Sequence, residues 1–419
     1  MKFQKIRGTR DLLPEEARRW LQAESVIREV MAKYGCAEIR TPIFEETELF
    51  ARSIGQLTDI VSKEMYTFQD RGEKSLTLRP ELTAPVVRAF IENNLGELLP
   101  LNKLYYIGQV FRQENPQAGR FRQFHQFGVE ILGSPVPAAD AETIALAVDI
   151  YQRFGIAEFT VEINSVGDQR CREPYKTALR DYLRPRLAKL CATCRGRFES
   201  NPLRILDCKV ESCRAETVGA PRFIDHLCQA CADHFAEVRR LLELAGIAYV
   251  VNHRLVRGLD YYTRTAFEII SQQLGAQDAL CGGGRYDLLC EELGGKPTPA
   301  VGFAAGMERL MIVLEKSGWS VESHAPRVFF VALGLEAQRW AFARARQLRR
   351  RGWRVEVDLL GRGVKAQLRE ANRQQAVAAV IIGDNEIAQQ VAQVKNLRDS
   401  TQTEVPMAEL EDNLSRFFA

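Results

Sequence analysis

Residues 104–133 read LYYIGQVFRQENPQAGRFRQFHQFGVEILG, and they are the most informative segment of the chain. Two runs rich in aromatic and β-branched residues surround a polar loop, which is typical of two paired strands. Side chains alternate faces along a strand, so Arg112 and Glu114 share one side of the first strand. On the returning strand, Gln126, Gly128 and Glu130 share one side, and the glycine leaves a hollow between two polar groups.

Each of these polar residues also has a purely structural interpretation. Arg112 and Glu114 could form no more than a cross-strand ion pair if the hairpin stood alone. His125 lies on the apolar side of the returning strand, and we interpret it as a packed or hydrogen-bonded histidine rather than a catalyst. The connecting loop, residues 115–122, is too long and basic for a minimal turn and could close over phosphates or reach a nucleic acid.

The chain as a whole has 419 residues, a net charge of +3 and the apolar fraction of an ordinary globular protein. Its length predicts two or three domains. The N-terminus has no apolar signal region, and no later run is long and uncharged enough to span a bilayer. We therefore expect a cytoplasmic protein with no membrane partner.

The first three quarters of the chain mix helices and strands. A helix is expected to begin at Pro14 and to end before Gly35, and a strand over residues 39–44 is interrupted by Pro42. Strands dominate from residue 60 to 132 around a helix at about 83–93. Helices prevail from about 168 to 246, strands and Gly-rich turns occupy 248–305, and a helix follows from Gly306 to about Lys316.

After Gly318 the pattern changes to regular alternation. Strands are expected at 328–333, 354–358 and 377–382, and helices at 338–350 and 364–372. This alternation implies a separate α/β domain of about one hundred residues. Its first helix carries a run of arginines at positions 344, 346, 349, 350 and 351, which is more often a solvated helix face than a nucleic-acid surface.

Two further segments carry side chains suited to ligand binding. Residues 79–83 read RPELT, and the carboxylate of Glu81 with the hydroxyl of Thr83 suits an ammonium group or, alternatively, caps the following helix. Residues 302–309 read GFAAGMER, so Arg309 is a second fixed cation beside a helix start. With Arg112, it indicates a nucleotide triphosphate site that has no Gly-rich P-loop.

Another pair of segments adds glycines and tyrosines. Residues 257–262 read RGLDYY and open a strand, and residues 281–287 read CGGGRYD. Glycines are needed where a backbone approaches a ligand closely, although tight turns use them too. A lone Gly triplet is a weak signal, whereas four such segments in order are a strong one.

These segments resemble those of the histidyl-tRNA synthetases, members of the class II aminoacyl-tRNA synthetase family, over essentially the whole chain. The helix and strand ending at Pro42 look like motif 1, residues 111–114 with the following loop and strand like motif 2, and residues 302–309 like motif 3. Segments 257–262 and 283–287 resemble signatures of the histidine enzymes. Leu82 departs from the common pattern, but the residues on either side of it are intact.

The resemblance implies an α+β fold. Residues 1–324 would form the catalytic domain, an antiparallel sheet flanked by helices with a helical insertion at about 168–246. Residues 325–419 would form an anticodon-binding α/β domain. Motif 1 implies a homodimer by analogy.

The resemblance also implies a reaction. ATP and L-histidine would give histidyl-adenylate and pyrophosphate, with Mg²⁺ on the leaving group, and the adenylate would acylate the terminal ribose of tRNA(His). Preorganised positive charge lowers the barrier of such a phosphoryl transfer, and the planar, always charged guanidinium group suits that task.

Individual roles follow from the same resemblance. Arg112 and Arg257 are the expected catalytic residues, on the α-phosphate and the substrate carboxylate, while Arg309 and Arg120 hold the ATP phosphates or adenine and Glu114 contacts the adenine amino group. Around histidine, the resemblance places Glu81, Thr83 and Gln126 on the ammonium group, Glu130 and Tyr262 on the imidazole, and Tyr261, Gly283 and Gly284 along the pocket wall. Gln117 is a candidate contact for the tRNA acceptor end.

The expected insertion is rich in cysteine. Cys191 with Cys194 and Cys228 with Cys231 form two Cys-x-x-Cys pairs that frame two more cysteines, at 208 and 213. In a cytoplasmic protein such pairs predict a tetrahedral structural zinc site, because disulfides would be reduced there. The gap between the pairs exceeds the usual spacing of about fifteen to twenty residues, so buried thiols are the alternative. The cysteines at 36, 171, 281 and 290 fit that alternative better.

Two other functions fit part of the pattern. A histidine-sensing regulatory paralogue would bind the amino acid without charging tRNA, but such proteins are expected to lack the ATP-contacting arginines or the C-terminal module. This chain has both. A class II synthetase for another small amino acid is disfavoured by Glu130, Tyr261 and Tyr262.

Overall fold

The computed structural model describes residues 3–54, 60–116, 119–256, 261–274, 279–321, 325 and 327–416. The chain divides into two compact units, Met1–Ser320 and Val321–Ala419. Each unit buries a hydrophobic core of its own. Among the described residues, no helix combines the length and apolar composition needed to cross a bilayer.

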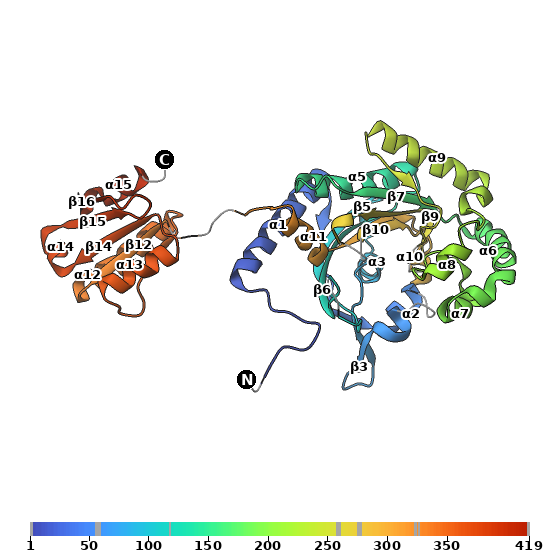
Figure 1. Ribbon diagram of the computed structural model, residues 1–419, viewed down its shortest axis with the longest axis horizontal. Helices are drawn as coiled ribbons and strands as arrows, with labels where there is room; N and C mark the ends of the chain where they lie inside the picture. The colour runs from blue at the N-terminus through green and yellow to red at the C-terminus, as the bar shows by residue number, and fades with distance from the viewer. Residues whose placement is uncertain are drawn as a thin grey trace. The chain divides into compact units, whose positions relative to one another are not determined.

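The first unit is built on a large sheet (Figure 1). Its described strands are β1 (Ala37–Glu38), β5 (Asn102–Phe111), β6 (Gln123–Leu132), β11 (Ala300–Gly306), β10 (Ala279–Arg285), β9 (Thr263–Ile270), β7 (Thr160–Ser165) and β8 (Val250–Val251), in that spatial order. All internal pairs are antiparallel, and only the two edge pairs among these strands, β1 with β5 and β7 with β8, are parallel. The predicted antiparallel core is confirmed.

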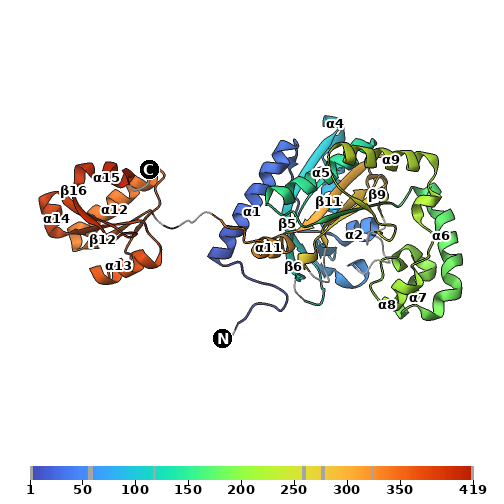
Figure 2. The ribbon, with the colours of Figure 1, turned by 45° about the horizontal axis from the view of Figure 1, so that its top comes forward.

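Helices cover both faces of this sheet (Figures 1 and 2). One face packs against α1 (Pro14–Lys33), α5 (Pro137–Arg153), α9 (Gln229–Leu244) and α11 (Met307–Lys316), and the other against α3 (Thr83–Glu92). On β6, Phe127, Val129 and Ile131 are buried in the first of these layers. The intervening residues, including Gly128 and Glu130, therefore face the side of α3, as the alternation in the sequence predicts.

Residues 39–44 do not form the predicted strand. β1 ends at Glu38, and β2 (Phe44–Glu46) belongs to a second sheet with β4 (Ser75–Leu78) and β3 (Tyr66–Gln69). The intervening carbonyls of Thr41 and Pro42 accept hydrogen bonds from the buried Arg79 guanidinium, at 2.7 and 3.0 Å. The Arg79 side chain thus makes the hydrogen bonds to these carbonyls that a neighbouring strand would otherwise make. Pro42 has no backbone N–H and could not donate a hydrogen bond to such a strand.

The predicted helical segment at 168–246 contains α6 (Gln169–Leu183), α7 (Ala192–Ser200), α8 (Glu211–Glu216) and α9, joined by short 3₁₀ turns. These helices enclose a small core of their own, in which Tyr175 and Phe223 stack with ring centroids 4.3 Å apart. The segment leaves the large sheet after β7 and returns to it at β8. The insertion is therefore attached at the edge of the sheet formed by β7 and β8, and α6, α7 and α8 lie together (Figure 1).

The second unit is a five-stranded sheet in the order β13-β12-β14-β15-β16, counted over the described residues. The strands are β12 (Val328–Leu333), β13 (Val355–Val357), β14 (Ala378–Gly383), β15 (Val391–Asn396) and β16 (Gln402–Pro406), and the helices are α12 (Leu335–Arg350), α13 (Val364–Arg373), α14 (Asp384–Gln389) and α15 (Leu410–Arg416). The first three strands are parallel, as alternation predicts. The antiparallel hairpin of β15 and β16 was not anticipated.

The arginine run on α12 serves partly to hold this unit together. Arg349 donates two hydrogen bonds to the carbonyl of Val355, at 2.9 and 2.6 Å. Arg344 and Arg351 both pair with Glu411 of α15. These three arginines are therefore committed to intradomain contacts.

Candidate active site

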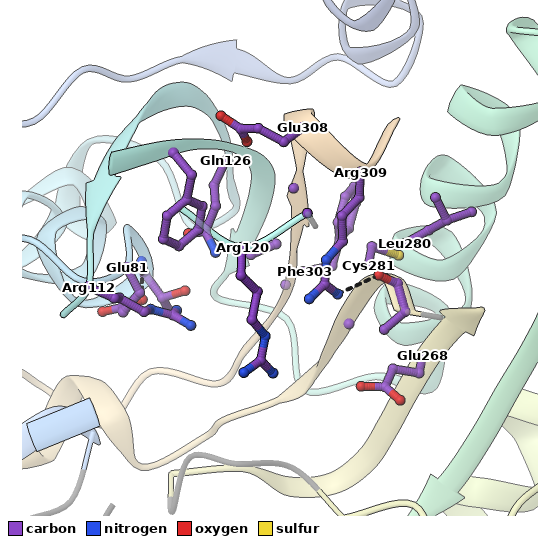
Figure 3. A pocket seen from close by; sticks show the side chains of 18 of the residues that line it. Glu81, Arg112, Arg120, Gln126, Glu268, Leu280, Cys281, Phe303, Glu308 and Arg309 are labelled. Atoms are coloured by element: carbon purple, nitrogen blue, oxygen red, sulfur yellow. Dashed lines mark hydrogen bonds between the residues drawn. The ribbon is translucent and has the colours of Figure 1, made fainter. Parts of the chain in front are cut away.

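A cavity of about 230 Å³ opens over the face of the large sheet that carries Gln126 and Glu130 (Figure 3). Strands β6, β9, β10 and β11 form its floor, and the segment before α3 forms one wall. The predicted site residues that line it are Glu81, Thr83, Arg112, Glu114, Arg120, Gln126, Glu130, Tyr261, Tyr262 and Arg309. Two other predicted residues, Arg257 and Gln117, lie outside the described part of the chain.

One end of the cavity is acidic and buried. The carboxylate of Glu130 is 1% exposed and accepts hydrogen bonds from the hydroxyls of Thr83, at 2.7 Å, and Tyr106, at 3.1 Å. The hydroxyl of Tyr286 donates to its other oxygen. Burial raises the pKa of Glu130 to about 8, because these three hydroxyls only partly offset the loss of water and Glu81 adds a second negative charge.

The second carboxylate at this end is Glu81. It accepts hydrogen bonds from the backbone N–H groups of Thr83 and Ala84, at 2.6 and 2.9 Å, and so caps the start of α3. Burial raises its pKa as well. Two buried carboxyls therefore lie at the same end of the cavity, where a cationic group would relieve their repulsion.

Three arginines also line the cavity, and the first of them, Arg112, lies beside Glu81 (Figure 3). Arg112 lies over the ring of Phe124, 5.4 Å from its centroid, and its Nε donates to the carbonyl of Pro80 at 2.9 Å. Glu114 lies between two guanidinium groups, 3.7 Å from Arg112 and 3.1 Å from Arg120. The ion pair between Arg112 and Glu114 exists, but it lines the cavity and is not a simple surface pair.

Arg309 is the third arginine of the cavity. Its Nη1 donates to the carbonyl of Ala279 at 2.7 Å, which aims the guanidinium along the floor of the cavity (Figure 3). Burial lowers the pKa of Arg309, and the positive charges of Arg120 and Arg112 lower it further, while the carboxylate of Glu114 opposes this effect. A bound anion would therefore be stabilised near Arg309.

His125 is a positioned structural residue, as the sequence predicts. Its ring packs edge-on against Trp20, with centroids 4.9 Å apart. Both its backbone N–H and its ring contact the carboxylate of Glu308, at 3.0 and 3.1 Å. His125 therefore lies on the apolar side of β6 and contacts the cavity residue Glu308.

Two tyrosines at the acidic end were missed in the sequence. Tyr106 and Tyr286 are buried, and both hydroxyls donate to Glu130. Alternation along β5 already places Tyr106 on the side of Arg112, so its position was available from the strand period. Tyr286 follows β10, and its approach to Glu130 depends on how three strands align, which the sequence does not reveal.

Tyr286 is held in place by a buried ion pair next to it in the chain. Arg285 is fully buried and donates to both carboxylate oxygens of Asp140 on α5, to the Ser134 carbonyl and to Asp287. His234 lies 3.3 Å from the same Asp140 carboxylate. Burial opposes ionisation of Asp140, but His234 and Arg285 outweigh it and hold its pKa below the usual value.

Replacing Asp140 with asparagine is therefore expected to destabilise the first unit by about 3–5 kcal/mol, because it leaves the buried Arg285 guanidinium without a counter-charge. Urea unfolding at pH 7 measures this loss. The folded-state pKa of Asp140 is depressed, so its contribution is present above the unfolded-state pKa and is lost as the pH falls through the folded value. Asp149→Asn, which removes an exposed carboxylate from the same helix, should change stability by less than about 1 kcal/mol. Equal effects of the two substitutions would contradict the expectation.

The cysteines of the insertion do not form the predicted single group. Cys191 and Cys194 lie with Cys208 and Cys213, whereas Cys228 and Cys231 lie with Cys171 and Asp168. A zinc site built from the two Cys-x-x-Cys pairs together is therefore wrong. The helices between the two Cys-x-x-Cys pairs separate them, so that each pair contacts a different segment of the insertion.

Comparison with known proteins follows the same two units. The family described as Histidyl-tRNA synthetase matches residues 8–171 and 178–310, and the family described as Anticodon binding domain matches residues 327–416. The histidine–tRNA ligase of Desulfitobacterium hafniense (strain DSM 10664 / DCB-2) is 51% identical over 414 residues, covering 98% of this chain and 97% of that protein. That of Desulforamulus reducens is 50% identical over 405 residues, covering 96% and 97%.

A solved structure agrees with these relatives. The crystal structure of apo Staphylococcus aureus histidyl-tRNA synthetase is 37% identical to this chain, superimposes with a TM-score of 0.83 and covers 99% of both chains. The match therefore extends through the sheet, the cavity and the C-terminal unit. On this sequence and structural similarity, the chain belongs to the histidyl-tRNA synthetase family.

Proposed function

We propose that this protein is a histidine–tRNA ligase, which activates L-histidine with ATP and transfers it to tRNA(His). The observation that carries the proposal is that one cavity holds both the buried carboxyls of Glu81 and Glu130 and the guanidinium groups of three arginines. Histidyl-adenylate has a matching polarity, with a cationic amino acid joined to an anionic phosphate. Full-length relatives at about half identity support the same assignment.

At the acidic end, Glu81, Thr83 and Gln126 would receive the ammonium group of histidine, and Glu130 would receive an imidazole N–H. The Glu130 carboxylate already accepts hydrogen bonds from the hydroxyls of Thr83, Tyr106 and Tyr286, which fix its orientation. Tyr261 and Tyr262 would close the pocket around the ring. A buried carboxylate rejects an analogue that lacks the ring nitrogen, because its own hydrogen bond would then be lost.

The cavity arginines Arg112, Arg120 and Arg309 would hold ATP. The histidine carboxylate oxygen attacks the α-phosphorus, the bond to the bridging oxygen breaks, and pyrophosphate leaves with the electron pair. Arg112 would stabilise the charge that accumulates on the α-phosphate oxygens, and Glu114 would accept a hydrogen bond from the adenine amino group. Mg²⁺ would neutralise the leaving pyrophosphate, and the cavity carboxylate Glu268 is a suitable oxygen ligand.

The second step requires tRNA. We assign recognition of the anticodon to the C-terminal unit, because an anticodon-binding family matches residues 327–416. The roles of Arg257 at the substrate carboxylate and of Gln117 at the acceptor end stay predictions, as do the homodimer and the cytoplasmic location. The catalytic role falls to the first unit, residues 1–320.

Histidine-dependent exchange of pyrophosphate into ATP tests the first step, with each amino acid offered separately. Exchange with histidine alone, followed by acylation of tRNA(His), is the expected result. Histidine binding without exchange would instead identify a regulatory paralogue. That alternative is less well supported, since the arginines of the cavity and the C-terminal unit are both present.

Gly302 makes room for the Glu130 carboxylate on the neighbouring strand. A Cβ at position 302 would collide with Glu130 Oε2 and with the carbonyl of Val129. Gly302→Ala is therefore expected to raise the KM for histidine about 10- to 100-fold and to change the KM for ATP much less. Gly196→Ala, where an added Cβ meets no atom within 4 Å, is the control. Equal KM values for histidine in these two variants would contradict this packing role.

A further inference from the structure

The cysteines of the insertion converge in two separate places. In the first group, Cys191, Cys194, Cys208 and Cys213 bring their sulfur atoms within 4.8 Å of one another. The Sγ atoms of Cys191 and Cys208 are 4.0 Å apart. A tetrahedral zinc ion with Zn–S bonds of about 2.3 Å holds its sulfurs about 3.8 Å apart, so this group needs little movement to bind one.

The second group joins segments that are far apart in the sequence. Asp168 and Cys171 meet Cys228 and Cys231, with all four ligand atoms again within 4.8 Å. Asp168 Oδ1 lies 3.3 Å from the sulfur of Cys171, and Asp168 Oδ2 lies 3.9 Å from that of Cys228. A tetrahedral zinc with one oxygen and three sulfur ligands requires distances of about 3.6 Å from a single oxygen, so the carboxylate would have to turn to present one oxygen to all three sulfurs.

The local backbone of both groups favours ionised ligands. Asp168, Cys191 and Cys228 are the N-cap residues of α6, α7 and α9, and the cysteine three residues later lies in the first turn of each helix. The N–H of Cys194 points to Cys191 Sγ, that of Cys191 to Cys213 Sγ and that of Cys228 to Cys171 Sγ, at 3.4, 3.1 and 3.1 Å. Helix N-termini and such N–H donors stabilise thiolates, the form that binds metal.

The alternative of ordinary buried thiols explains less. All ten cysteines are free thiols in this structure, so neither group is a set of disulfides. Apolar packing alone does not explain why two separate groups of four potential metal ligands form. By contrast, Cys36 and Cys290 lie singly in apolar cores. Arg170 pairs with Asp168 Oδ2 at 2.9 Å and would offset part of the negative charge of such a site, while Oδ1 accepts the backbone N–H groups of Arg170 and Cys171.

We propose that the insertion holds two structural zinc ions, one on Cys191, Cys194, Cys208 and Cys213 and one on Asp168, Cys171, Cys228 and Cys231. The first closes a local loop between α7 and α8. The second fastens the start of α6, shortly after β7, to the start of α9, the helix that packs on the large sheet before β8. Because ligand atoms must be held together, metal binding would stabilise the folded insertion.

Metal analysis of the full-length protein tests this inference. Protein produced with added zinc and purified without chelators is expected to hold about two zinc ions per chain by mass spectrometry of the metal. Cys208→Ser and Cys171→Ser should each lower the content to about one, and Asp168→Ala should act like Cys171→Ser. Cys36→Ser, a buried cysteine outside both groups, should keep two.

A measurement on the unsubstituted protein guards against variants that fail to fold. Cobalt added to metal-free protein should produce sulfur-to-cobalt absorption that saturates at about two equivalents, since cobalt adopts the same tetrahedral sites. Absence of bound metal would overturn the proposal. If the unsubstituted protein, Cys171→Ser and Asp168→Ala all held about one zinc per chain, the second centre would be overturned.

Discussion

Replacing Arg112 with glutamine is expected to lower histidine-dependent pyrophosphate exchange by about 10³-fold. The guanidinium lies at the cavity wall, fixed by the Pro80 carbonyl and by the ring of Phe124. In the proposed reaction, it faces the phosphorus at which negative charge accumulates. Removal of one preorganised charge donor of this kind usually costs 10²- to 10³-fold or more, roughly 3–4 kcal/mol of transition-state stabilisation.

Steady-state exchange kinetics should show this loss mainly in kcat, because the interaction strengthens in the transition state. Arg28→Gln is a matched control. Arg28 lies on α1, which covers the face of the large sheet opposite the cavity, and it pairs with Glu24 and Glu38. Its loss should therefore leave kcat within about twofold. If Arg112→Gln changed only the KM for ATP, Arg112 would serve binding and not the chemical step.

Replacing Glu130 with glutamine is expected to lower kcat/KM for histidine by about 10²- to 10³-fold while the KM for ATP changes little. The amide cannot accept an imidazole N–H with the strength of a carboxylate, and it offers an N–H₂ group to hydroxyls that now donate to Glu130. Exchange kinetics with varied histidine and then varied ATP separate the two effects. Similar losses for both substrates would contradict a specific role at the imidazole.

The pH dependence of stability separates this effect from misfolding. Glu130 has a folded-state pKa of about 8, above the value of about 4.3 in an unfolded chain, so protonation favours the fold. This contribution is present below the unfolded-state pKa and is lost as the pH rises toward 8. The variant, which cannot titrate here, should therefore become more stable relative to the unsubstituted protein between pH 5.5 and pH 8, as measured by urea unfolding.

One substitution beside Glu130 and two controls sharpen the interpretation. Tyr286→Phe removes a donor to Glu130 and should produce a smaller loss in kcat/KM, of about tenfold. Tyr105→Phe removes a hydroxyl that donates to Glu38 on the other face of β5, and it should have little effect on catalysis. Glu162→Gln, on β7 and bonded to Asn252, is the control for loss of a carboxylate.

Local patterns were sufficient for much of the fold. The strand period along 123–132 correctly assigns Phe127, Val129 and Ile131 to the core and leaves Glu130 on the cavity side. Helix starts at Pro14 and near Gly306 agree with the structure because capping and proline preferences act within a few residues. The prediction of a strand at 39–44 was wrong because Arg79, which is distant in the sequence, donates hydrogen bonds to carbonyls of this segment.

Sequence alone predicts the alternating strands, the residue types of the cavity and the family resemblance, because each depends on short-range order along the chain. Which distant groups meet depends on the tertiary structure. It brings Tyr286 to Glu130 and Arg285 to Asp140, and it separates the two Cys-x-x-Cys pairs into groups with Cys208 and Cys213 or with Asp168 and Cys171. Partner choice of this kind depends on the packing of whole helices and strands, and such packing minimises the free energy of the entire unit and not of any single segment.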